Sequence, residues 1–210
     1  MFDSKAIINA LVECDEPKVL ELVQNAVDEG VAAKEILNQG LISGMDIVGE
    51  KMENEDMFIP EVLMAAKAMS AAVGILKPLL TDDDITALGK VVIGTVKGDL
   101  HDIGKNLVAM MLESAGFEVY NLGVDISPDK FVSGVNEKNA NMVCLSALLT
   151  TTMPMMKQTI DALAENGLKD RVKIMVGGAP VTQNFADEIG ADGYAPDAGS
   201  ATKLAKILLQ

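Results

Sequence analysis

Apolar residues recur at helical spacing through the first part of the chain, from Ser4 to about Leu80. Helix boundaries are marked as well. The stretch Asp15 to Pro17 predicts a helix start with proline in the first turn, Gly30 predicts the end of that helix, and Pro60 opens a later one. Four helices of about 10 to 20 residues fit this segment, so the pattern predicts a four-helix bundle.

After Lys90 the pattern changes to short apolar runs that alternate with helix-like segments. Strands buried on both faces have such continuous runs, and the helices between them make the crossovers that a parallel sheet requires. The runs are VVIGTV (91–96), FEVYNL (117–122), MVCLSA (142–147), KIMVGG (173–178) and DGYA (192–195). They predict an α/β fold with an open, doubly wound, five-stranded parallel sheet of the flavodoxin-like kind.

Residues 81–90, TDDDITALGK, contain an acidic run and one glycine but few apolar side chains. We interpret them as a linker between a helical cap domain, residues 1–88, and a sheet domain, residues 89–210. A calcium loop is the alternative, but calcium ligands alternate along such a loop, whereas these acidic residues are consecutive. The linker is therefore the preferred interpretation.

The chain is acidic, with 31 Asp and Glu against 17 Lys and Arg among 210 residues and a formal net charge of −14. Such a surface repels nucleic acid and anionic membranes, so neither is an expected partner. The first residues show no cleavable leader, and no apolar run reaches the roughly 18 residues that span a bilayer, which predicts a cytoplasmic protein. Cys14 and Cys144 are expected to be reduced, with Cys144 buried.

In an open parallel sheet the ligand site lies beyond the carboxyl ends of the strands. His101, the one histidine of the chain, follows the first predicted strand, Ser146 ends the third, and the pair Gly177-Gly178 ends the fourth. A lone histidine is more often a structural residue than a metal ligand. The residues around His101 therefore decide how it is interpreted.

Common motifs do not account for this segment. Gly98 and Gly104-Lys105 bracket the histidine, but the spacing of a phosphate-binding loop is missed by one, and Asn106 stands where its hydroxyl belongs. The dinucleotide fingerprint, a full set of zinc ligands and the G-x-S-x-G elbow of hydrolases are also missing from the sequence. One histidine does suit a metal whose other positions are filled by a macrocycle, and Asp99 could accept a hydrogen bond from its second ring nitrogen.

Three sequence elements carry a family resemblance: D-x-H-x-x-G at residues 99–104, S-x-L at 146–148 and G-G at 177–178. With these elements and their spacing, the chain resembles the corrinoid, or cobalamin-binding, proteins of methylamine, betaine and methanol methyltransferase systems, which are related to the cobalamin-binding module of methionine synthase. The segment GMDIVGEKMENEDMFIPEVLMAA, residues 44–66, resembles the helical cap module of the same proteins. The resemblance thus covers nearly the whole chain.

The resemblance implies a role for each matching residue. His101 would be the lower axial ligand of cobalt, in place of the cofactor's own base, Asp99 would hold His101, and Thr152, where the family often has serine, would extend that relay. Ser146, Leu148 and Thr150 would line the slot for the nucleotide tail, which Gly177, Gly178 and Ala179 would allow to approach closely. An ordinary turn after a strand remains the alternative for each glycine. The implied cofactor contacts also include Asp102, Ile103 and Gly104.

In the cap, the resemblance places Met52, Ile59 and Val62 over the upper, methyl-bearing face of the cofactor. Met52 stands where methionine synthase has a larger aromatic residue. Core packing is the alternative for all three, because apolar residues at helical spacing occur in any bundle. The cap would have to move to expose the cofactor, with residues 81–90 as the hinge.

The implied function is that of a methyl carrier rather than a stand-alone enzyme. The corrinoid, a cobalamin or a relative of it, would cycle between cob(I)alamin and methylcob(III)alamin, and His101 would switch with the redox state of the cobalt. One partner would be a substrate-specific methyltransferase, of methylamine or betaine type by preference. The other would pass the methyl group to tetrahydrofolate or coenzyme M, and a reductive activase is a third expected partner.

Two other classes share these modules. A cobalamin-dependent sensor would carry a DNA-reading domain, and no such domain precedes the cap in this sequence. A mutase small subunit would normally have the sheet domain without the cap. A neighbouring gene for a methyltransferase barrel would favour the carrier, and one for a mutase large subunit would oppose it.

Overall fold

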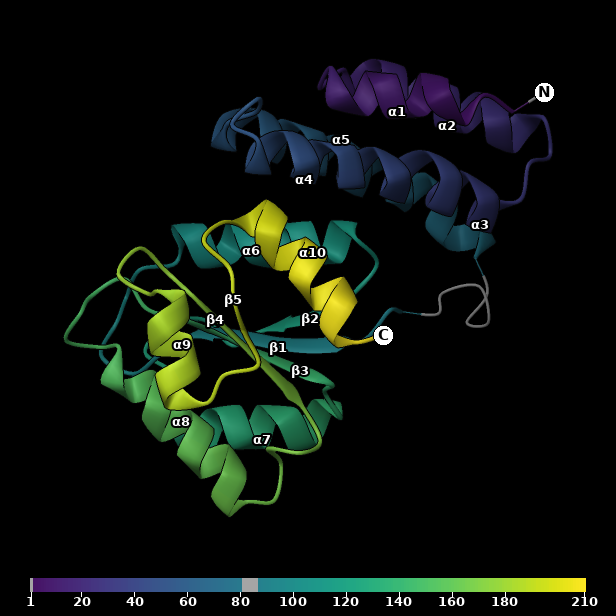
Figure 1. Cartoon of the computed structure of the whole chain (residues 1–210). Helices are drawn as coiled ribbons and strands as arrows, with labels where there is room; N and C mark the ends of the chain where they lie inside the picture. Colours follow the sequence, from purple (N-terminus) through teal and green to yellow (C-terminus); the bar gives the residue numbers. More distant parts are fainter. Residues whose placement is uncertain (1, 81–86) are drawn as a thin grey trace. The chain divides into compact units, whose positions relative to one another are not determined.

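The computed structural model describes residues 2–80 and 87–210. These residues form two compact units, one helical and one containing the sheet (Figure 1). Most of the predicted linker, residues 81–86, lies outside the described residues, as do the acidic residues of the alternative calcium loop. Lys90, placed at the end of the linker, already belongs to a strand. The domain bounds 1–88 and 89–210 stay predictions.

The helical unit contains four helical stretches, as the apolar pattern predicts. Asp15 begins the second helix, where its side chain accepts a hydrogen bond from the Lys18 amide at 3.1 Å, and Gly30 follows the end of that helix with a positive φ of 78°. The third stretch is continuous but passes through a π-helical segment, η1. The elements are α1 (Ser4–Val12), α2 (Glu16–Asp28), α3 (Ala33–Glu35), η1 (Ile36–Ile42), α4 (Ser43–Glu53), α5 (Ile59–Leu76) and the 3-10 turn η2 (Lys77–Leu79).

Helix α5 is the most apolar helix of this unit. Among the described residues, the stretch Ile59–Leu79 alone is long and apolar enough to cross a membrane by length and composition, contrary to the expectation that no such run exists. The core helix of a bundle passes the same test, and α5 buries Val62, Ala65, Ala66, Ala68, Met69, Ala72 and Leu76. One such helix is weak evidence for a membrane span, and the cytoplasmic location stays a prediction.

The second unit is built on five parallel strands in the order β2-β1-β3-β4-β5. This order confirms the predicted doubly wound sheet and the α/β fold class. Each strand lies within its predicted apolar run, to within one residue. The strands are β1 (Lys90–Thr95), β2 (Glu118–Asn121), β3 (Met142–Ser146), β4 (Lys173–Gly177) and β5 (Gly193–Tyr194).

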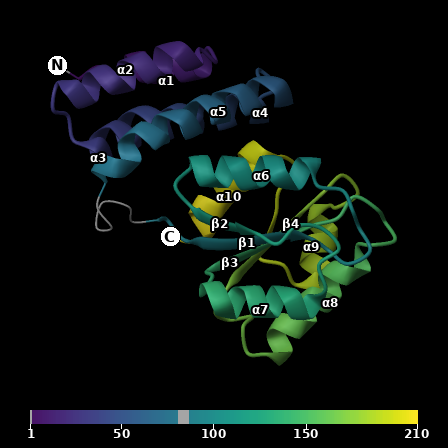
Figure 2. The same cartoon turned by 180° about the vertical axis from the view of Figure 1, so that it is seen from behind.

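Helices cover both faces of this sheet. Figures 1 and 2 show α6 and α10 on one face and α7 and α8 on the other. The core on the α7 side is formed by strand residues such as Val92, Val143 and Ile174 and by helix residues such as Phe131 and Ile160. The helices are α6 (Ile103–Ser114), α7 (Pro128–Lys138), α8 (Pro154–Glu165), α9 (Gln183–Ile189) and α10 (Ala198–Leu208).

The two strands at the middle of the sheet position the site. Strands β1 and β3 are hydrogen-bonded neighbours, and their last residues, Thr95 and Ser146, are register partners. The strand order changes direction between them, because β2 follows β1 on the far side. At such a switch point the loops after the two strands diverge and leave room for a ligand. The segments 96–102 and 147–153 are those loops.

The two cysteines are both free, as expected. Cys144 lies in β3 and is buried, and burial raises the pKa of its thiol to about 12. A thiol with so high a pKa is a poor nucleophile at neutral pH. Cys144 therefore acts as a small core residue, as the sequence predicts.

Candidate functional site

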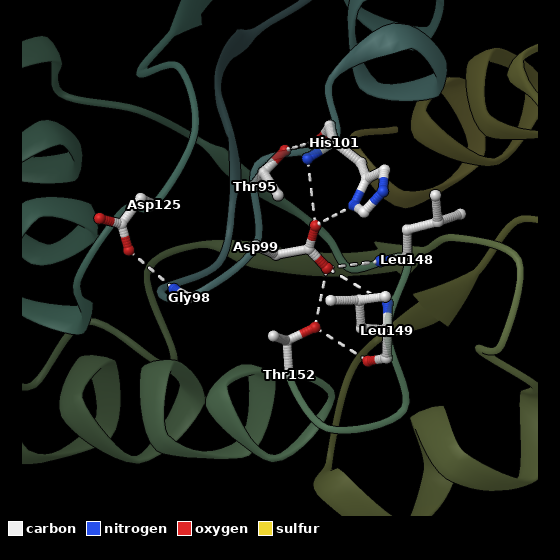
Figure 3. A network of polar contacts seen from close by, with 8 residues as sticks. All are labelled: Thr95, Gly98, Asp99, His101, Asp125, Leu148, Leu149 and Thr152. Atoms are coloured by element: carbon white, nitrogen blue, oxygen red, sulfur yellow. Dashed lines mark hydrogen bonds and ion pairs between the residues drawn. The ribbon is translucent and has the colours of Figure 1, made fainter.

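The loop after β1 brings Asp99 and His101 together. The ring Nδ1 of His101 lies 2.7 Å from Asp99 Oδ1, and the backbone N–H of His101 donates to the same oxygen at 3.1 Å (Figure 3). The hydroxyl of Thr95, at the end of β1, donates to the carbonyl oxygen of His101 at 2.8 Å. Ring, amide and carbonyl of the histidine are thus each held by a separate hydrogen bond.

The loop after β3 supplies donors to the second oxygen of Asp99. Asp99 Oδ2 accepts from the amides of Leu148 at 2.8 Å and Leu149 at 3.2 Å, and the hydroxyl oxygen of Thr152 lies 2.8 Å away. Asp99 is fully buried, and a buried carboxylate is costly unless its oxygens accept hydrogen bonds. The loop after β3 therefore stabilises this carboxylate, and the carboxylate fixes His101.

These contacts keep the Asp99 carboxylate ionised. Burial by itself raises the pKa of Asp99, but the hydrogen bonds from the Leu148 amide, His101 and Thr152 outweigh it and hold the pKa well below its ordinary value. Asp99 is then an ionised acceptor, so Nδ1 of His101 carries the proton that it shares with Asp99. Nε2 is left with its lone pair available, on a side chain that is half exposed.

Exposed apolar side chains surround the histidine in the sequence. Leu100 is 71% exposed and Ile103 is 78% exposed, on either side of His101. Leu148 and Leu149, in the loop that binds Asp99, are also exposed. Large apolar side chains gathered on two neighbouring loops are typical of a surface that another apolar body covers.

The other predicted residues of this unit lie at the start of α6 and the end of β3. Asp102 precedes α6, where its Oδ2 accepts from the Asn106 side chain at 3.0 Å. Gly104 faces open space, since a Cβ built there meets no atom within 4 Å. Ser146 is half-buried at the end of β3, and Thr150 is exposed in the following loop. Asp102, Gly104, Ser146 and Thr150 are thus all exposed or half-buried.

The glycine pair is explained differently. Gly178 has a φ of +129°, and a Cβ there would lie 1.9 Å from the carbonyl oxygen of Ala147. At Gly177 the same atom would lie 3.0 Å from the carbonyl oxygen of Ala195. The fold itself therefore requires glycine at 178, which supports the turn interpretation there. Ala179 is exposed beside the pair.

The three residues predicted in the helical unit differ in exposure. Ile59 is 45% exposed at the start of α5, and Met52 is half-buried near the end of α4. Val62 is fully buried, so core packing accounts for it in this structure. The exposed apolar residues near Ile59 are instead Phe58, Leu63 and Met64, which the sequence interpretation missed because it relied on family positions.

Sequence interpretation also missed three residues around Asp99 and His101. Leu149 donates an amide to Asp99, Thr95 binds the His101 carbonyl, and Asp125 accepts from the Gly98 amide at 2.7 Å (Figure 3). The bond from the Leu149 amide could not be predicted, because every residue except proline has a backbone N–H. Thr95 could have been found, because it is a polar residue at the last position of an apolar strand.

A metal fits this site only if most of its ligands come from elsewhere. Among residues 2–80 and 87–210, no group of three or more His, Cys, Asp or Glu side chains could hold a metal ion. A half-exposed imidazole with a free Nε2, oriented through Nδ1 by a buried carboxylate, matches a single axial ligand. The exposed apolar side chains beside it suit a flat macrocycle that supplies the remaining metal ligands.

Comparisons with known proteins agree with this description. Two family models described as B12 binding domains match residues 4–77 and 89–203. A dimethylamine corrinoid protein of Methanosarcina barkeri is 47% identical over 204 residues, 97% of this chain and 95% of that protein.

Two solved structures have nearly the same fold along the whole chain. A cobalamin-binding protein from Desulfitobacterium hafniense DCB-2 has a TM-score of 0.86 and 35% identity, over 99% of this chain and 98% of that one. The methanol:cobalamin methyltransferase complex of Methanosarcina barkeri contains a chain with a TM-score of 0.85 and 31% identity, over 98% of this chain and 79% of that one.

Proposed function

The chain belongs to the B12-binding corrinoid proteins that partner methyltransferases, and we propose that it carries a methyl group from one methyltransferase to another. The observation that carries the proposal is the pair Asp99 and His101, which leaves Nε2 of a half-exposed imidazole free at the switch point of the sheet. A cobalamin or related corrinoid is the cofactor. When bound, it supplies a cobalt ion that can accept and give up a methyl group.

The residues of the sheet unit would hold this cofactor from below. Nε2 of His101 would be the axial nitrogen ligand, and Asp99 would keep the ring in one tautomer and raise its basicity as a ligand. Leu148 and Leu149 would have two roles. Their amides bind Asp99, and their exposed side chains would contact the cofactor. The other proposed cofactor contacts are Asp102, Ile103, Gly104, Ser146, Thr150, Gly177, Gly178 and Ala179.

His101 would act as a switch and not as an acid or base toward substrate. An unbound Nε2 would be open to a proton, and the ionised Asp99 would stabilise the resulting imidazolium. Only an unprotonated Nε2 would offer the lone pair that a metal ligand needs. The hydrogen bond at Nδ1 would keep the ring in place through both states.

We infer that the methyl donor is a methylamine, and dimethylamine first of all. The support is the dimethylamine corrinoid protein of Methanosarcina barkeri, to which the chain is similar along almost its full length. The acceptor enzyme would act on tetrahydrofolate or coenzyme M, and a reductive activase would restore the reduced cofactor. In the helical unit, Ile59 and Met52 would shield the methyl-bearing face, whereas the buried Val62 would support their helices.

The test uses the full chain loaded with cobalamin and reduced to cob(I)alamin. Candidate methyltransferases encoded beside its gene are added with dimethylamine, monomethylamine, trimethylamine or methanol, and loss of the cob(I)alamin absorption is followed. We expect a rapid reaction with dimethylamine in the presence of the methyltransferase that acts on it. A loaded protein that no donor and enzyme pair methylates would contradict the carrier function, and a reaction with methanol alone would overturn the choice of substrate.

A further inference from the structure

A second loop braces the loop that carries Asp99 and His101. The segment 122–126 after β2 runs beside the end of β1: the Thr95 amide donates to Gly123, and the Ile126 amide donates back to Thr95, each at 3.0 Å. Val96 and Ile126 continue the contact as a parallel bridge. The loop after β2 is therefore joined to the residues that lead directly into the His101 loop.

One residue of this second loop, Asp125, binds two consecutive residues of the His101 loop. Its carboxylate Oδ1 accepts from the Gly98 amide at 2.7 Å, and its own amide donates to the carbonyl oxygen of Asp99 at 3.0 Å. Asp125 thus holds the peptide unit that precedes Gly98 and the peptide unit that follows Asp99. Figure 3 shows Asp125 on the opposite side of the loop from the contacts that bind the Asp99 side chain.

The backbone at both ends of this contact is unusual. Gly98 has a φ of +84° and Asp125 has a φ of +54°. A positive φ costs a residue with a Cβ of order 1 kcal/mol or more, although Asp and Asn tolerate it best. The turn at Gly98 lets the chain send the Asp99 side chain inward, where it is fully buried, while the imidazole of His101 stays half exposed.

The bracing loop is itself anchored to α6, which begins two residues after His101. Asn121 Oδ1 accepts from the Gly123 amide at 3.0 Å and from the ammonium of the buried Lys105 at 2.7 Å. Asp125 therefore binds the His101 loop from a segment that is itself held by hydrogen bonds to α6. Gly98 is exposed, so water can replace the lost acceptor if Asp125 is changed. Its bond is then worth more for the placement of the loop than for the stability of the fold.

We propose that Asp125 is a positioning residue for His101, which sets how strongly Nε2 binds the cobalt of a bound corrinoid. The inference rests on the proposed function, since it assumes that His101 is the axial ligand. Asp125 lies outside the D-x-H-x-x-G, S-x-L and G-G elements and touches the histidine only through Gly98 and Asp99. Changing it should weaken the axial bond and leave the fold intact.

Three substitutions separate the acceptor from the backbone conformation. Asp125→Asn keeps an acceptor oxygen and tolerates a positive φ, Asp125→Gly keeps the φ without an acceptor, and Asp125→Ala lacks both. Asn139→Ala is the matched control, because Asn139 also has a positive φ, 51°, at the end of α7 and has no contact with the His101 loop among the hydrogen bonds described. Each protein is loaded with hydroxocobalamin and reduced to cob(II)alamin.

The readouts are the nitrogen splitting in the electron paramagnetic resonance spectrum of cob(II)alamin, the affinity for hydroxocobalamin, and thermal unfolding of the cofactor-free protein. We expect Asp125→Ala and Asp125→Gly to lose most of the nitrogen splitting and to bind cobalamin about tenfold more weakly, as for other partners that orient a metal ligand. Asp125→Asn should restore both, and Asn139→Ala should lower only the unfolding temperature.

Wild-type splitting and affinity in both Asp125→Ala and Asp125→Gly, with the fold intact, would overturn the inference. Equal losses in Asn139→Ala would also overturn it, because the effect would then be general destabilisation. A wild-type protein without nitrogen splitting would refute the axial role of His101 and, with it, this inference. Normal splitting in a wild-type protein that transfers no methyl group would refute the carrier function alone, and the spectra of the variants would still decide the role of Asp125.

Discussion

The sheet unit and the helical unit hold their predicted site residues by different means. In the sheet unit, Asp99, His101 and Thr152 are joined by hydrogen bonds of 2.7 to 2.8 Å. In the helical unit, Met52, Ile59 and Val62 are apolar, and one of them is fully buried. A hydrogen bond needs particular atoms in a particular place, whereas packing accepts many side chains of similar volume. A motif is therefore informative in the first unit and ambiguous in the second.

The largest expected effect is the complete loss of the axial nitrogen in His101→Ala. The nitrogen splitting of bound cob(II)alamin should vanish, and cobalamin should bind at least about tenfold more weakly. Added imidazole should restore the splitting by occupying the vacated position. Splitting that persists in this variant without imidazole would show that the axial nitrogen comes from the cofactor's own base, and the contrast between the two units would lose its main support.

Gly178→Ala should destabilise the fold more than any other substitution considered in this comparison. Its Cβ would lie 1.9 Å from the Ala147 carbonyl oxygen, at a φ of +129°. Strain and overpacking together predict a loss of about 3 kcal/mol or more in the free energy of unfolding, measured by urea denaturation. Gly104→Ala is the control, because the added methyl group meets open space.

Gly104→Ala should leave the unfolding free energy unchanged or raise it by up to about 1 kcal/mol, because alanine favours a helix. If Gly104 is a cofactor contact, the same variant should bind cobalamin more weakly. An unfolding free energy that falls as far as in Gly178→Ala would contradict the assignment of the two glycines to different roles.

Asp99→Asn should cost about 2 kcal/mol in the free energy of unfolding of the cofactor-free protein at pH 7. An amide has one acceptor oxygen, so either His101 or the amides of Leu148 and Leu149 lose their partner. The pKa of Asp99 is lower in the folded protein than in the unfolded chain, so the carboxylate stabilises the fold above the unfolded pKa and loses this effect as the pH falls.

The stability gap between wild type and Asp99→Asn should therefore narrow as the pH falls from about 5. Urea denaturation at several pH values measures it, with Asp170→Asn, at an exposed carboxylate, as the control. A gap that stays constant down to acid pH would mean that the carboxylate is not held ionised by its donors.

In the helical unit the smallest effects are expected. Val62→Ala removes two buried methyl groups and should cost about 1.5 kcal/mol in the free energy of unfolding. Ile59→Ala, at a position 45% exposed, should cost less than half as much. If Ile59 shields the cofactor, its variant should nonetheless reoxidise faster as cob(I)alamin, which absorbance in air measures. Equal reoxidation rates in both variants would leave packing as the role of both residues.

Much of the fold could be predicted because each unit has a strong periodic signal. The five apolar runs gave the strands within a residue, and Asp15, Gly30 and Pro60 marked helix ends at the observed places. The bond between Asp99 and His101 could be predicted because two residues of spacing bring the side chains within reach. The amides of Leu148 and Leu149 and the bracing by Asp125 could not, because they depend on how the loops after three strands fold.

The bonds to Asp99 also determine when the site can appear during folding. Leu148 and Thr152 are 49 and 53 positions beyond Asp99 in the chain, and they reach it only after β1 has paired with β3. A chain that has formed β1 and β2 alone would leave the carboxylate in water and the imidazole unanchored. The cofactor would then bind only molecules in which β1 has paired with β3. Its binding would stabilise these molecules and not the partly folded ones.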